Sequence, residues 1–323
     1  MAEPTKVVTL LPSATEIVGG LLPPDRLDRL VAVSHECDFP VAAVADRPRI
    51  TGSIIPHGLS SAEIDAAVSA AFKAQQPLYR VNGDLLAELR PSLIVTQGLC
   101  DVCAVNANTV DETLMALPDA LTDTLAETKV LSLTGQDLEG VLTDIERVGA
   151  ALDRAEAAAS WNANLRDRWQ RLADSMPTQK PRVLMLEWND PPFFGGHWVP
   201  EMVEVAGGVD VFGKPGQPSG RCTWDEIVAS DPDIVLSIAC GHNLEQNIEL
   251  MHDLFERPEF HGLRAVRSGD LWAIDANSYF SRPAPRIVDG AEILREVFTG
   301  TMSGSMPDIT GAARIQFRSR VGV

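Results

Sequence analysis

Residues 135–176 read GQDLEGVLTDIERVGAALDRAEAAASWNANLRDRWQRLADSM, a stretch that contains no proline. Alanine is frequent in it, and larger apolar residues recur three or four positions apart, a spacing that places them on one face of an α-helix. Pro177 and Pro181 follow, and a proline just beyond a periodic stretch commonly marks the end of a helix. We therefore expect one long helix over residues 135–177. Its apolar face carries Leu138, Val141, Leu142, Ile145, Val148 and Leu152.

Short β-rich runs alternate with helical patterns on both sides of this stretch. Such alternation is typical of βα units and of a mainly parallel sheet. The runs cover residues 7–11, 30–34, 93–97 and 129–133 before the helix and 182–187, 233–238 and 271–275 after it. The sequence therefore predicts an α/β protein in which one long α-helix joins two Rossmann-like lobes with mainly parallel sheets.

The length of 323 residues also favours two domains over one. We expect an N-terminal lobe over residues 1–134, the linking helix over 135–177 and a C-terminal lobe over 178–299. Residues 300–323 are rich in Gly, Ser, Thr and Met without periodicity, which predicts a tail or a loosely packed extension. A single stiff helix permits only modest closure of two lobes, and a ligand is expected in the cleft between them.

The chain is strongly acidic, with 45 acidic against 27 basic residues and a formal net charge of -18. Nucleic acids and anionic membrane surfaces attract Lys and Arg, so this charge argues against both as partners. No apolar stretch approaches the length of a membrane span, and the first strand is expected to begin near Val7. If Met1 is the native start, this predicts a cytoplasmic protein; removal of an export signal would instead indicate a periplasmic or secreted one.

Two Ser-x-x-Glu patterns have the spacing of a helix capping box, in which the hydroxyl and the carboxylate satisfy free amides at a helix start. They are Ser13 to Glu16 and Ser60 to Glu63. Each is expected to mark the first turn of a helix.

Three cysteines stand just past apolar runs, where the ends of parallel strands would line a ligand crevice. Together with a histidine they offer one imidazole and three thiolates, a donor set that suits zinc: His35, Cys37, Cys100 and Cys103. Thiolates hold copper(I) or an iron–sulfur cluster equally well, and a free cysteine often serves only as a small apolar packing residue. A redox role for the Cys100-x-x-Cys103 pair ranks lower, because the Asp101 carboxylate would raise the thiol pKa.

The most distinctive segment is Glu187 to Met202, EWNDPPFFGGHWVPEM, in which prolines and glycines forbid a regular element. Its aromatic rings suit a large planar ligand, although at least half of them are expected to fill the core beneath the loop. His197, or His242 just after Cys240, offers an axial imidazole for the cobalt or iron of a tetrapyrrole. The alternative for either histidine is a hydrogen bond to a loop carbonyl.

Arg282 and Arg286 lie four residues apart and are suited to grip a carboxylate or phosphate, or to pair with surface acids. Hydrolase motifs are missing from the sequence: there is no Gly-x-Ser-x-Gly elbow, no Gly-x-x-x-x-Gly-Lys loop and no His-Glu-x-x-His helix. We therefore expect a binding protein and no enzyme.

The whole plan resembles a known family. The opening LLPSATE at residues 10–16, the Pro191-Pro192-Phe193 loop leading to Ala206-Gly207-Gly208, and the closing RPAPRIVDG at residues 282–290 are similar to the helical-backbone (class III) substrate-binding proteins of ABC importers. The vitamin B12-binding, BtuF-like branch is the most similar. The resemblance covers residues 6–298.

The resemblance implies a solute receptor that clamps a corrinoid, haem or metal chelate between its lobes without turnover. Carried over by motif, its ligand contacts would be Pro12, Ser13 and Thr15 from the first strand end, Trp188, Phe193, Phe194 and Trp198 from the second lobe, and Tyr279, Arg282 and Arg286 from the closing loop. Such receptors dock on a permease through acidic residues, for which Glu63 and Glu204 are candidates.

The expected function is therefore non-catalytic binding of cobalamin or a related corrinoid, for uptake through an ABC permease or for retention near a corrinoid-using protein. The alternatives are haem or metal-chelate binding, and a zinc or iron–sulfur protein built on the histidine and the three cysteines. The remaining candidate ligand contacts, all at expected strand ends or in the aromatic loop, are His35, Cys37, His197, Cys240 and His242.

Overall fold

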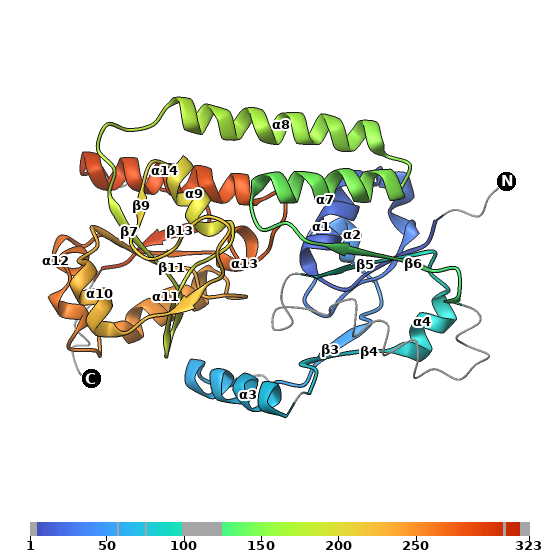
Figure 1. The fold of residues 1–323 in the computed structure, drawn as a ribbon, viewed down its shortest axis with the longest axis horizontal. Helices are drawn as coiled ribbons and strands as arrows, with labels where there is room; N and C mark the ends of the chain where they lie inside the picture. Colours follow the sequence, from blue (N-terminus) through green and yellow to red (C-terminus); the bar gives the residue numbers. More distant parts are fainter. Residues whose placement is uncertain (1–4, 57, 75, 99–124, 306–307, 317–323) are drawn as a thin grey trace. The chain divides into compact units, whose positions relative to one another are not determined.

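The computed structural model describes residues 5–56, 58–74, 76–98, 125–305 and 308–316 (Figure 1). The chain divides into two compact units, unit 1 with residues 1–163 and unit 2 with residues 164–323. The boundary falls inside the stretch expected to link two lobes, whereas the lobe boundaries themselves stay a prediction. Within the described residues, no helix has both the length and the apolar character needed to cross a bilayer.

Unit 1 is built on a four-stranded parallel sheet in the order β2-β1-β5-β6. Its strands are β1 (Val7–Thr9), β2 (Leu30–Ala32), β5 (Leu93–Gln97) and β6 (Lys129–Leu133). A separate antiparallel pair joins β3 (Thr51–Ser53) to β4 (Tyr79–Val81). The helices among the described residues before the linking stretch ends are α1 (Pro12–Leu21), η1 (Pro24–Arg29), α2 (Val41–Val44), α3 (Ser61–Lys73), α4 (Gly83–Leu89) and α7 (Leu138–Ala151).

Unit 2 contains a seven-stranded sheet in the order β10-β8-β7-β11-β12-β13, with β9 paired to β7. The pairs β7–β9, β7–β11 and β11–β12 are parallel, and β7–β8, β8–β10 and β12–β13 are antiparallel. The strands are β7 (Arg182–Asn189), β8 (Pro192–Phe194), β9 (Val209–Asp210), β10 (Gly220–Arg221), β11 (Ile234–Ser237), β12 (Leu271–Ile274) and β13 (Ala312–Arg314). The expected α/β fold with mainly parallel central strands is confirmed.

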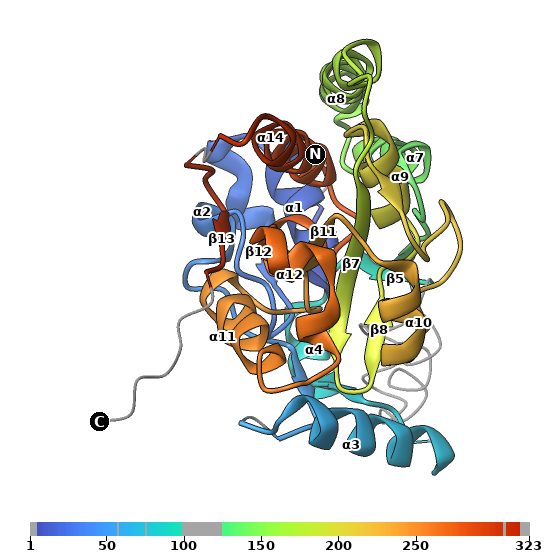
Figure 2. The same cartoon turned by 90° about the vertical axis from the view of Figure 1, so that its left-hand side faces the viewer.

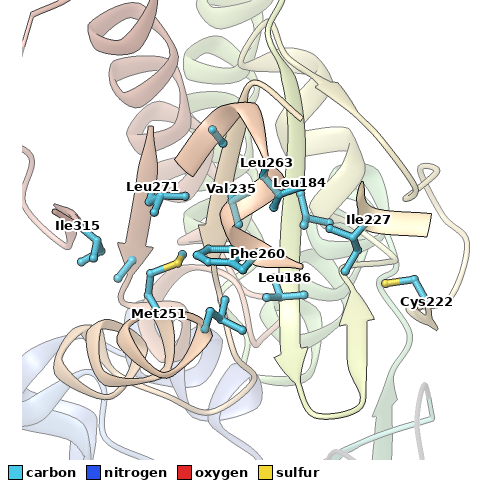
Figure 3. Close-up of a cluster of buried hydrophobic side chains, with 13 residues drawn as sticks. Leu184, Leu186, Cys222, Ile227, Val235, Met251, Phe260, Leu263, Leu271 and Ile315 are labelled. Carbon is cyan, nitrogen blue, oxygen red and sulfur yellow. The ribbon is translucent and has the colours of Figure 1, made fainter. Parts of the chain in front are cut away.

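In the part of unit 2 that the structure describes, six α-helices follow the linking stretch: α9 (Val199–Val205), α10 (Trp224–Ser230), α11 (Leu244–Leu254), α12 (Arg264–Ser268), α13 (Ala276–Tyr279) and α14 (Ile287–Ser303), with a 3₁₀ turn η2 (Phe260–Gly262). Helices α10, α11 and α12 lie on one face of the sheet, as Figure 2 shows. A buried cluster fills the space between them and the strands, with the fully buried ring of Phe260 among Leu186, Val235 and Met251 (Figure 3). This core fixes the β7 and β11 strand ends that carry candidate site residues.

The stretch expected to form one helix contains two, α7 and α8 (Ala155–Asp174), separated by Leu152, Asp153 and Arg154. Asp153 has a left-handed backbone (φ 58), which Asp tolerates better than most residues, and the Arg154 amide donates to Gly149 O over 2.7 Å. Gly149 also allows close packing, since a Cβ there would lie 2.5 Å from the Cβ of Ala158. The apolar spacing continues through residues 152–154. The sequence pattern therefore did not indicate that α7 ends there, at the left-handed Asp153.

Helix α8 contributes to both units. In unit 1 its Trp161 ring lies against Gly20, and Asn162 Nδ2 donates to Leu142 O over 2.8 Å. In unit 2 its Arg168 bonds to Asp289 and to Glu292 of α14, with a distance of 3.0 Å from Arg168 Nε to Glu292 Oε1. Each half of the helix is therefore fixed on the unit to which it belongs.

Two further expectations need correction. Ser60 forms a capping box with Glu63, and Ser13 to Glu16 does mark the first turn of a helix, α1. Ser13 is not its cap, however, because the helix begins at Pro12 and has Leu11 as its N-cap. The described residues after Phe298 do not form a loose tail: α14 continues to Ser303, and β13 adds an edge strand beside β12. Ile309 and Ile315 are buried there, and a three-residue strand is too short to show a period.

Candidate functional site

The ends of three parallel strands in unit 2 carry most of the expected ligand contacts. Strands β7, β11 and β12 run parallel, so the loops that follow them meet at one edge of the sheet. Backbone bonds connect these loops: the Cys240 amide donates to Glu187 O over 3.2 Å, and the Asn277 amide donates to His242 O over 2.9 Å. A further bond, 2.9 Å from the Gly241 amide to Ser281 Oγ, fixes the β11 loop. The structure thus brings Trp188, Cys240, His242 and α13 into one cluster.

A β-bulge in β7 turns Trp188 away from the core. Leu186 pairs with Phe194, yet Trp188 pairs with Phe193, so β7 has one extra residue, Glu187, at this point. Directly paired residues share a face of the sheet, and Leu186 and Phe194 pack against the buried cluster of Figure 3. Trp188 and Phe193 consequently face the opposite side of the ribbon, an effect for which bulges next to binding sites are known.

The bulge completes a line of four side chains, which we call the aromatic row. Arg221 of β10 pairs with Phe193, and its Cζ lies 5.2 Å from the centroid of the Phe193 ring. Phe193 pairs with Trp188, whose ring meets the His242 ring edge-on at a centroid distance of 5.5 Å. The three rings are half-buried and the Arg221 side chain is exposed. Along the chain, β8, α9, β9, β10, α10 and β11 lie between Trp188 and His242, so only the sheet brings the two residues together.

Trp198 and Phe194 have structural roles. The Trp198 indole is buried and donates from Nε1 to Phe280 O over 2.8 Å, while the Phe194 ring stacks on Phe212 with centroids 5.6 Å apart. Both therefore match the alternative in which part of the aromatic loop fills the core. Their expected contact with a ligand stays a prediction.

His197 occupies a constrained position in the same loop. Its backbone is left-handed (φ 54), its amide donates to Gln217 O over 2.6 Å, and its carbonyl accepts from the Gly216 amide over 2.9 Å. The imidazole stacks on Trp198, and burial lowers its pKa, which favours the neutral form that binds metals. Nδ1 is buried with no hydrogen-bond partner among the described residues.

The closing segment holds α13 against α14. Arg282 is buried and donates from Nη2 to Asn277 Oδ1 over 2.6 Å. The Arg286 guanidinium lies 5.9 Å from the centroid of the Tyr279 ring, and that ring packs against Gly311. Burial raises the pKa of Tyr279. Arg286 and Tyr279 are thus in contact, and Arg282 orients Asn277 of α13.

In unit 1 the expected contacts follow β1 and β2. Thr15 Oγ1 lies 2.6 Å from Thr9 Oγ1 and 2.9 Å from the Cys37 sulfur, and all three residues are buried. His35 Nδ1 lies 2.7 Å from Thr51 Oγ1. Buried Ser13 lies beside half-buried Pro12 in the first turn of α1. The thiol of Cys37 is therefore part of a buried hydrogen-bonded group, which agrees with a packing role.

The metal expectation depends on residues that the structure does not describe. Cys100 and Cys103 lie outside the described ranges. Among the residues that are described, no group of three or more His, Cys, Asp or Glu side chains is arranged to hold a metal ion. A zinc or iron–sulfur centre stays a prediction.

A family model described as periplasmic binding protein matches residues 7–278. The chain belongs to this family. The vitamin B12-binding protein of Vibrio cholerae is 22% identical over 296 residues, which cover 89% of this chain and 86% of that protein. The cobalamin-binding protein of Halobacterium salinarum is 23% identical over 305 residues, 93% of this chain and 71% of that protein. The family resemblance expected from the sequence motifs is confirmed.

Solved structures of the family share the fold. The periplasmic vitamin B12-binding protein BtuF of Vibrio cholerae has a TM-score of 0.63 at 19% identity and covers 92% of this chain and 98% of that one. The periplasmic heme-binding protein BhuT, in complex with two hemes, has a TM-score of 0.66 at 20% identity and covers 93% and 99%. At these identities the match concerns the fold alone, so the ligand has to be argued from the side chains of this chain.

Two residues of interest escaped the sequence patterns. Arg221 ends a Gly- and Pro-rich loop, and only the pairing of β10 with β8 places it on Phe193. Asp210, in the two-residue strand β9, accepts hydrogen bonds through Oδ1 from the amides of Phe212 and Gly213, at 2.9 and 2.7 Å. An Asp two residues before the amide that donates to it is a typical turn signal, but burial of the carboxylate has no local signature.

Burial raises the pKa of Asp210 to about 6, above its ordinary value of 3.8. The folded state therefore holds this proton more tightly than the unfolded state does. The Asp210 carboxyl should therefore lower the free energy of unfolding of unit 2 by about 3 kcal/mol as pH rises from about 4 to 6. Above that pH its contribution should stay level. Asp210→Asn keeps the Oδ1 acceptor and should remove that fall.

Urea unfolding of both proteins at a series of pH values between 4 and 7.5 measures the effect. Asp253→Asn, an exposed position on α11, is the matched control and should keep the pH dependence of the unsubstituted protein. If the free energy of unfolding of Asp210→Asn changed with pH in parallel with that of the unsubstituted protein, protonation of Asp210 would not contribute to the pH dependence of stability.

Proposed function

We propose that this member of the periplasmic binding protein family binds cobalamin or a related corrinoid without catalysing a reaction. The observation that carries the proposal is the pairing of Trp188 with Phe193 on the face of the β7–β8 ribbon opposite the core. Rings in this position are available to stack on a large flat macrocycle. Two curated relatives that span most of this chain are named for binding vitamin B12 or cobalamin, which supports a corrinoid over other macrocycles.

The unit 2 contacts that we propose are Trp188, Phe193, His242, Cys240 and Tyr279, all partly exposed at strand ends or on α13. From unit 1 we propose Pro12, Ser13, Thr15 and His35, which follow the ends of β1 and β2. Arg282 and Arg286 would position α13 and supply charge. Each unit thus offers polar and flat groups from loops that its own core holds in place.

Haem is a second candidate, because an imidazole is a common axial ligand of haem iron and two histidines lie beside aromatic rings. His242 contacts Trp188, and His197 stacks on Trp198 with a buried Nδ1 that has no hydrogen-bond partner in the described part of the chain. The fold shared with a protein solved in complex with two hemes is compatible with this alternative.

Visible spectroscopy separates the two candidates. Hydroxocobalamin and hemin would each be added to the purified protein, followed by size-exclusion chromatography with detection at the absorption bands of each ligand. Binding of cobalamin in about one equivalent supports the main proposal; exclusive binding of hemin, with a shifted Soret band, supports the alternative. Co-elution of neither ligand with the protein would contradict both.

Trp188→Ala should weaken tetrapyrrole binding about tenfold or more, because it removes the largest ring of the proposed contact surface. A stacked aromatic contact contributes of the order of 1 to 2 kcal/mol, and 1.4 kcal/mol corresponds to a factor of ten. Titration calorimetry would give the dissociation constants. Trp169→Ala, a half-buried tryptophan on α8, is the matched control and should leave the affinity unchanged. Equal losses in both variants would argue against a role for Trp188.

Delivery of the ligand to an ABC permease is part of the same proposal. Glu204 is exposed on α9 and suits docking on a basic surface. Glu63 is also exposed, but its carboxylate caps α3 by bonding to the amide and hydroxyl of Ser60, and these bonds lower its pKa. Glu204 is therefore the better candidate of the two. A corrinoid-using recipient protein is the alternative partner, and the compartment of the protein stays a prediction.

A further inference from the structure

The loop between β11 and α11 carries His242, the histidine of the aromatic row. Its imidazole is fixed by a hydrogen bond of 3.0 Å between Nδ1 and the carbonyl oxygen of Cys240. A carbonyl oxygen can only accept, so Nδ1 carries the proton and, in the neutral ring, Nε2 keeps its lone pair. Nε2 forms no hydrogen bond to a residue that the structure describes. The ring therefore has one donor atom for a metal, and that atom is Nε2.

This pattern of hydrogen bonding is typical of histidines that bind metals. Such a histidine commonly donates its other ring N–H to a backbone carbonyl, which fixes the tautomer and the orientation of the ring. His197, the other histidine considered for axial binding, lacks this bond, because its buried Nδ1 has no partner among the described residues. Only His242 of the two thus has its tautomer set by the protein.

The plane of the His242 ring has the orientation that axial coordination requires. The His242 and Trp188 rings make an angle of 79° at a centroid distance of 5.5 Å. A macrocycle stacked parallel to the Trp188 ring would therefore be nearly perpendicular to the imidazole. The lone pair of Nε2 lies in the plane of the imidazole, so it can be directed at the metal in the centre of such a macrocycle.

Asn247 of α11 fixes the loop that carries His242. Its side chain is fully buried, and its Oδ1 accepts from Ser237 Oγ at 2.9 Å and from the Ala239 amide at 2.8 Å. Its Nδ2 donates to the carbonyl oxygens of His242 and Asn243, at 3.1 and 3.2 Å. One buried amide therefore joins the end of β11 to the start of α11 and restrains His242 between them.

We propose that His242 is an axial ligand of the metal in the bound tetrapyrrole, with Nε2 as the donor atom, and that Asn247 is the residue that positions it. This inference rests on the proposed function. The metal has two chemical sources, the cobalt of a corrinoid and the iron of haem. In either case the Nε2 lone pair forms a coordinate bond to the metal and the water molecule in that axial position leaves, with no change in oxidation state.

The first test titrates hydroxocobalamin and hemin into the protein and follows the visible and near-ultraviolet bands. Because imidazole changes the ligand field when it replaces water, binding should shift the bands of the ligand that the protein takes. His242→Ala should return these bands toward those of the aqua complex and weaken the affinity about tenfold or more. His252→Ala, a half-buried histidine of α11 outside the aromatic row, is the matched control and should bind like the unsubstituted protein.

Labelling the histidines with ¹⁵N identifies the donor residue. Pulsed EPR is recorded on the ferric haem complex, or on the corrinoid complex after chemical reduction to Co(II). The unsubstituted protein should show a ¹⁵N coupling to the metal that His242→Ala lacks. An unchanged coupling in His242→Ala, or its loss in His197→Asn, overturns the inference, because another residue would then hold the metal.

Asn247→Ala tests the positioning role, and Ser237→Ala is its control. Both substitutions remove a buried member of the same hydrogen-bonded group, so both should lower the thermal midpoint. Only Asn247→Ala releases the His242 carbonyl, so only this variant should lose part of the band shift and about tenfold in affinity. Asn247→Asp, which keeps the Oδ1 acceptor, gives the same measurement if the alanine variant does not fold. A band shift retained in full overturns the positioning role.

The outcomes separate the inference from the function on which it rests. If a ligand binds with the same spectrum in the unsubstituted protein and in His242→Ala, coordination by His242 is overturned while tetrapyrrole binding stands. If the unsubstituted protein binds neither ligand, the proposed function fails and the inference fails with it. A shift that depends on His242 for hydroxocobalamin identifies cobalt as the metal, and one for hemin identifies iron.

Discussion

Replacing Arg295 with methionine should lower the free energy of unfolding of unit 2 by about 3 kcal/mol. Arg295 of α14 donates from Nε to Ala206 O, from Nη2 to Val205 O and Leu172 O, and from Nη1 to Ser175 O and Oγ, at 2.7 to 2.9 Å. These acceptors belong to the C-terminal ends of α9 and α8, where carbonyls have no partner within their own helix. Methionine preserves the apolar stem but satisfies none of them.

Unfolding in urea, with hydrogen exchange measured on peptides from residues 164–323, would localise the loss to unit 2, because a two-unit chain need not unfold in one step. Arg171→Met is the control: Arg171 is an exposed residue of α8 that pairs with Asp167 one turn earlier, and its loss should cost less than 1 kcal/mol. Arg295→Lys should recover only part of the stability, since an ammonium has fewer donors. A change in Arg295→Met as small as that in the control would refute the helix-end role.

Gly196→Ala is expected to disrupt the aromatic loop and with it ligand binding. A Cβ at Gly196 would lie 2.0 Å from Ser219 N and 2.4 Å from Pro218 C, both backbone atoms that no side-chain rotation can move. The segments around residues 196 and 218 would have to separate, which would break the backbone hydrogen bonds that join His197 to Gly216 and Gln217. We expect a loss of about 3 kcal/mol in stability and at least a tenfold loss in tetrapyrrole affinity.

Gly262→Ala provides the comparison, because a Cβ at Gly262 meets no atom within 4 Å. It should shift the free energy of unfolding by less than about 0.5 kcal/mol and leave the affinity unchanged. Thermal melts and ligand titrations of both variants measure the two effects. If Gly196→Ala melts and binds like Gly262→Ala, the close packing of residue 196 on the 218–219 backbone is not required for the site.

The strands of the central sheets could be predicted because each buried strand is a run of consecutive, mostly apolar residues. Leu93–Gln97 and Ile234–Ser237 are buried along their whole length, as expected for parallel strands covered on both faces. The helical period of Leu138 to Leu152 likewise predicted α7. The predictions that were wrong concern helix ends, which single residues decide. The left-handed Asp153 ends α7, and α1 starts at Pro12, so Ser13 has the spacing of a cap but not the position.

The candidate site divides in the same way. Its residue types could be predicted, and so could the strands before Trp188 and His242, which follow apolar runs. Strand β8, which carries Phe193, was missed, because the prolines and glycines around it predicted no regular element. The bulge at Glu187, which decides the face of Trp188, could not, because it depends on the partner strand β8 and not on the sequence of β7. The roles of Trp198 and Phe194 in the core and of Arg221 on the rim likewise come from contacts with distant segments.

The sequence by itself determined the α/β class, the positions of the central parallel strands along the chain, and the family to which the chain belongs. The tertiary structure alone decided which rings face away from the core, which arginine joins them, and where the expected helix divides. The physical reason is the range of the interactions: burial patterns and helix periods are set within a few residues, whereas β-sheet register, bulges and cation–π contacts are set by residues that the fold brings together.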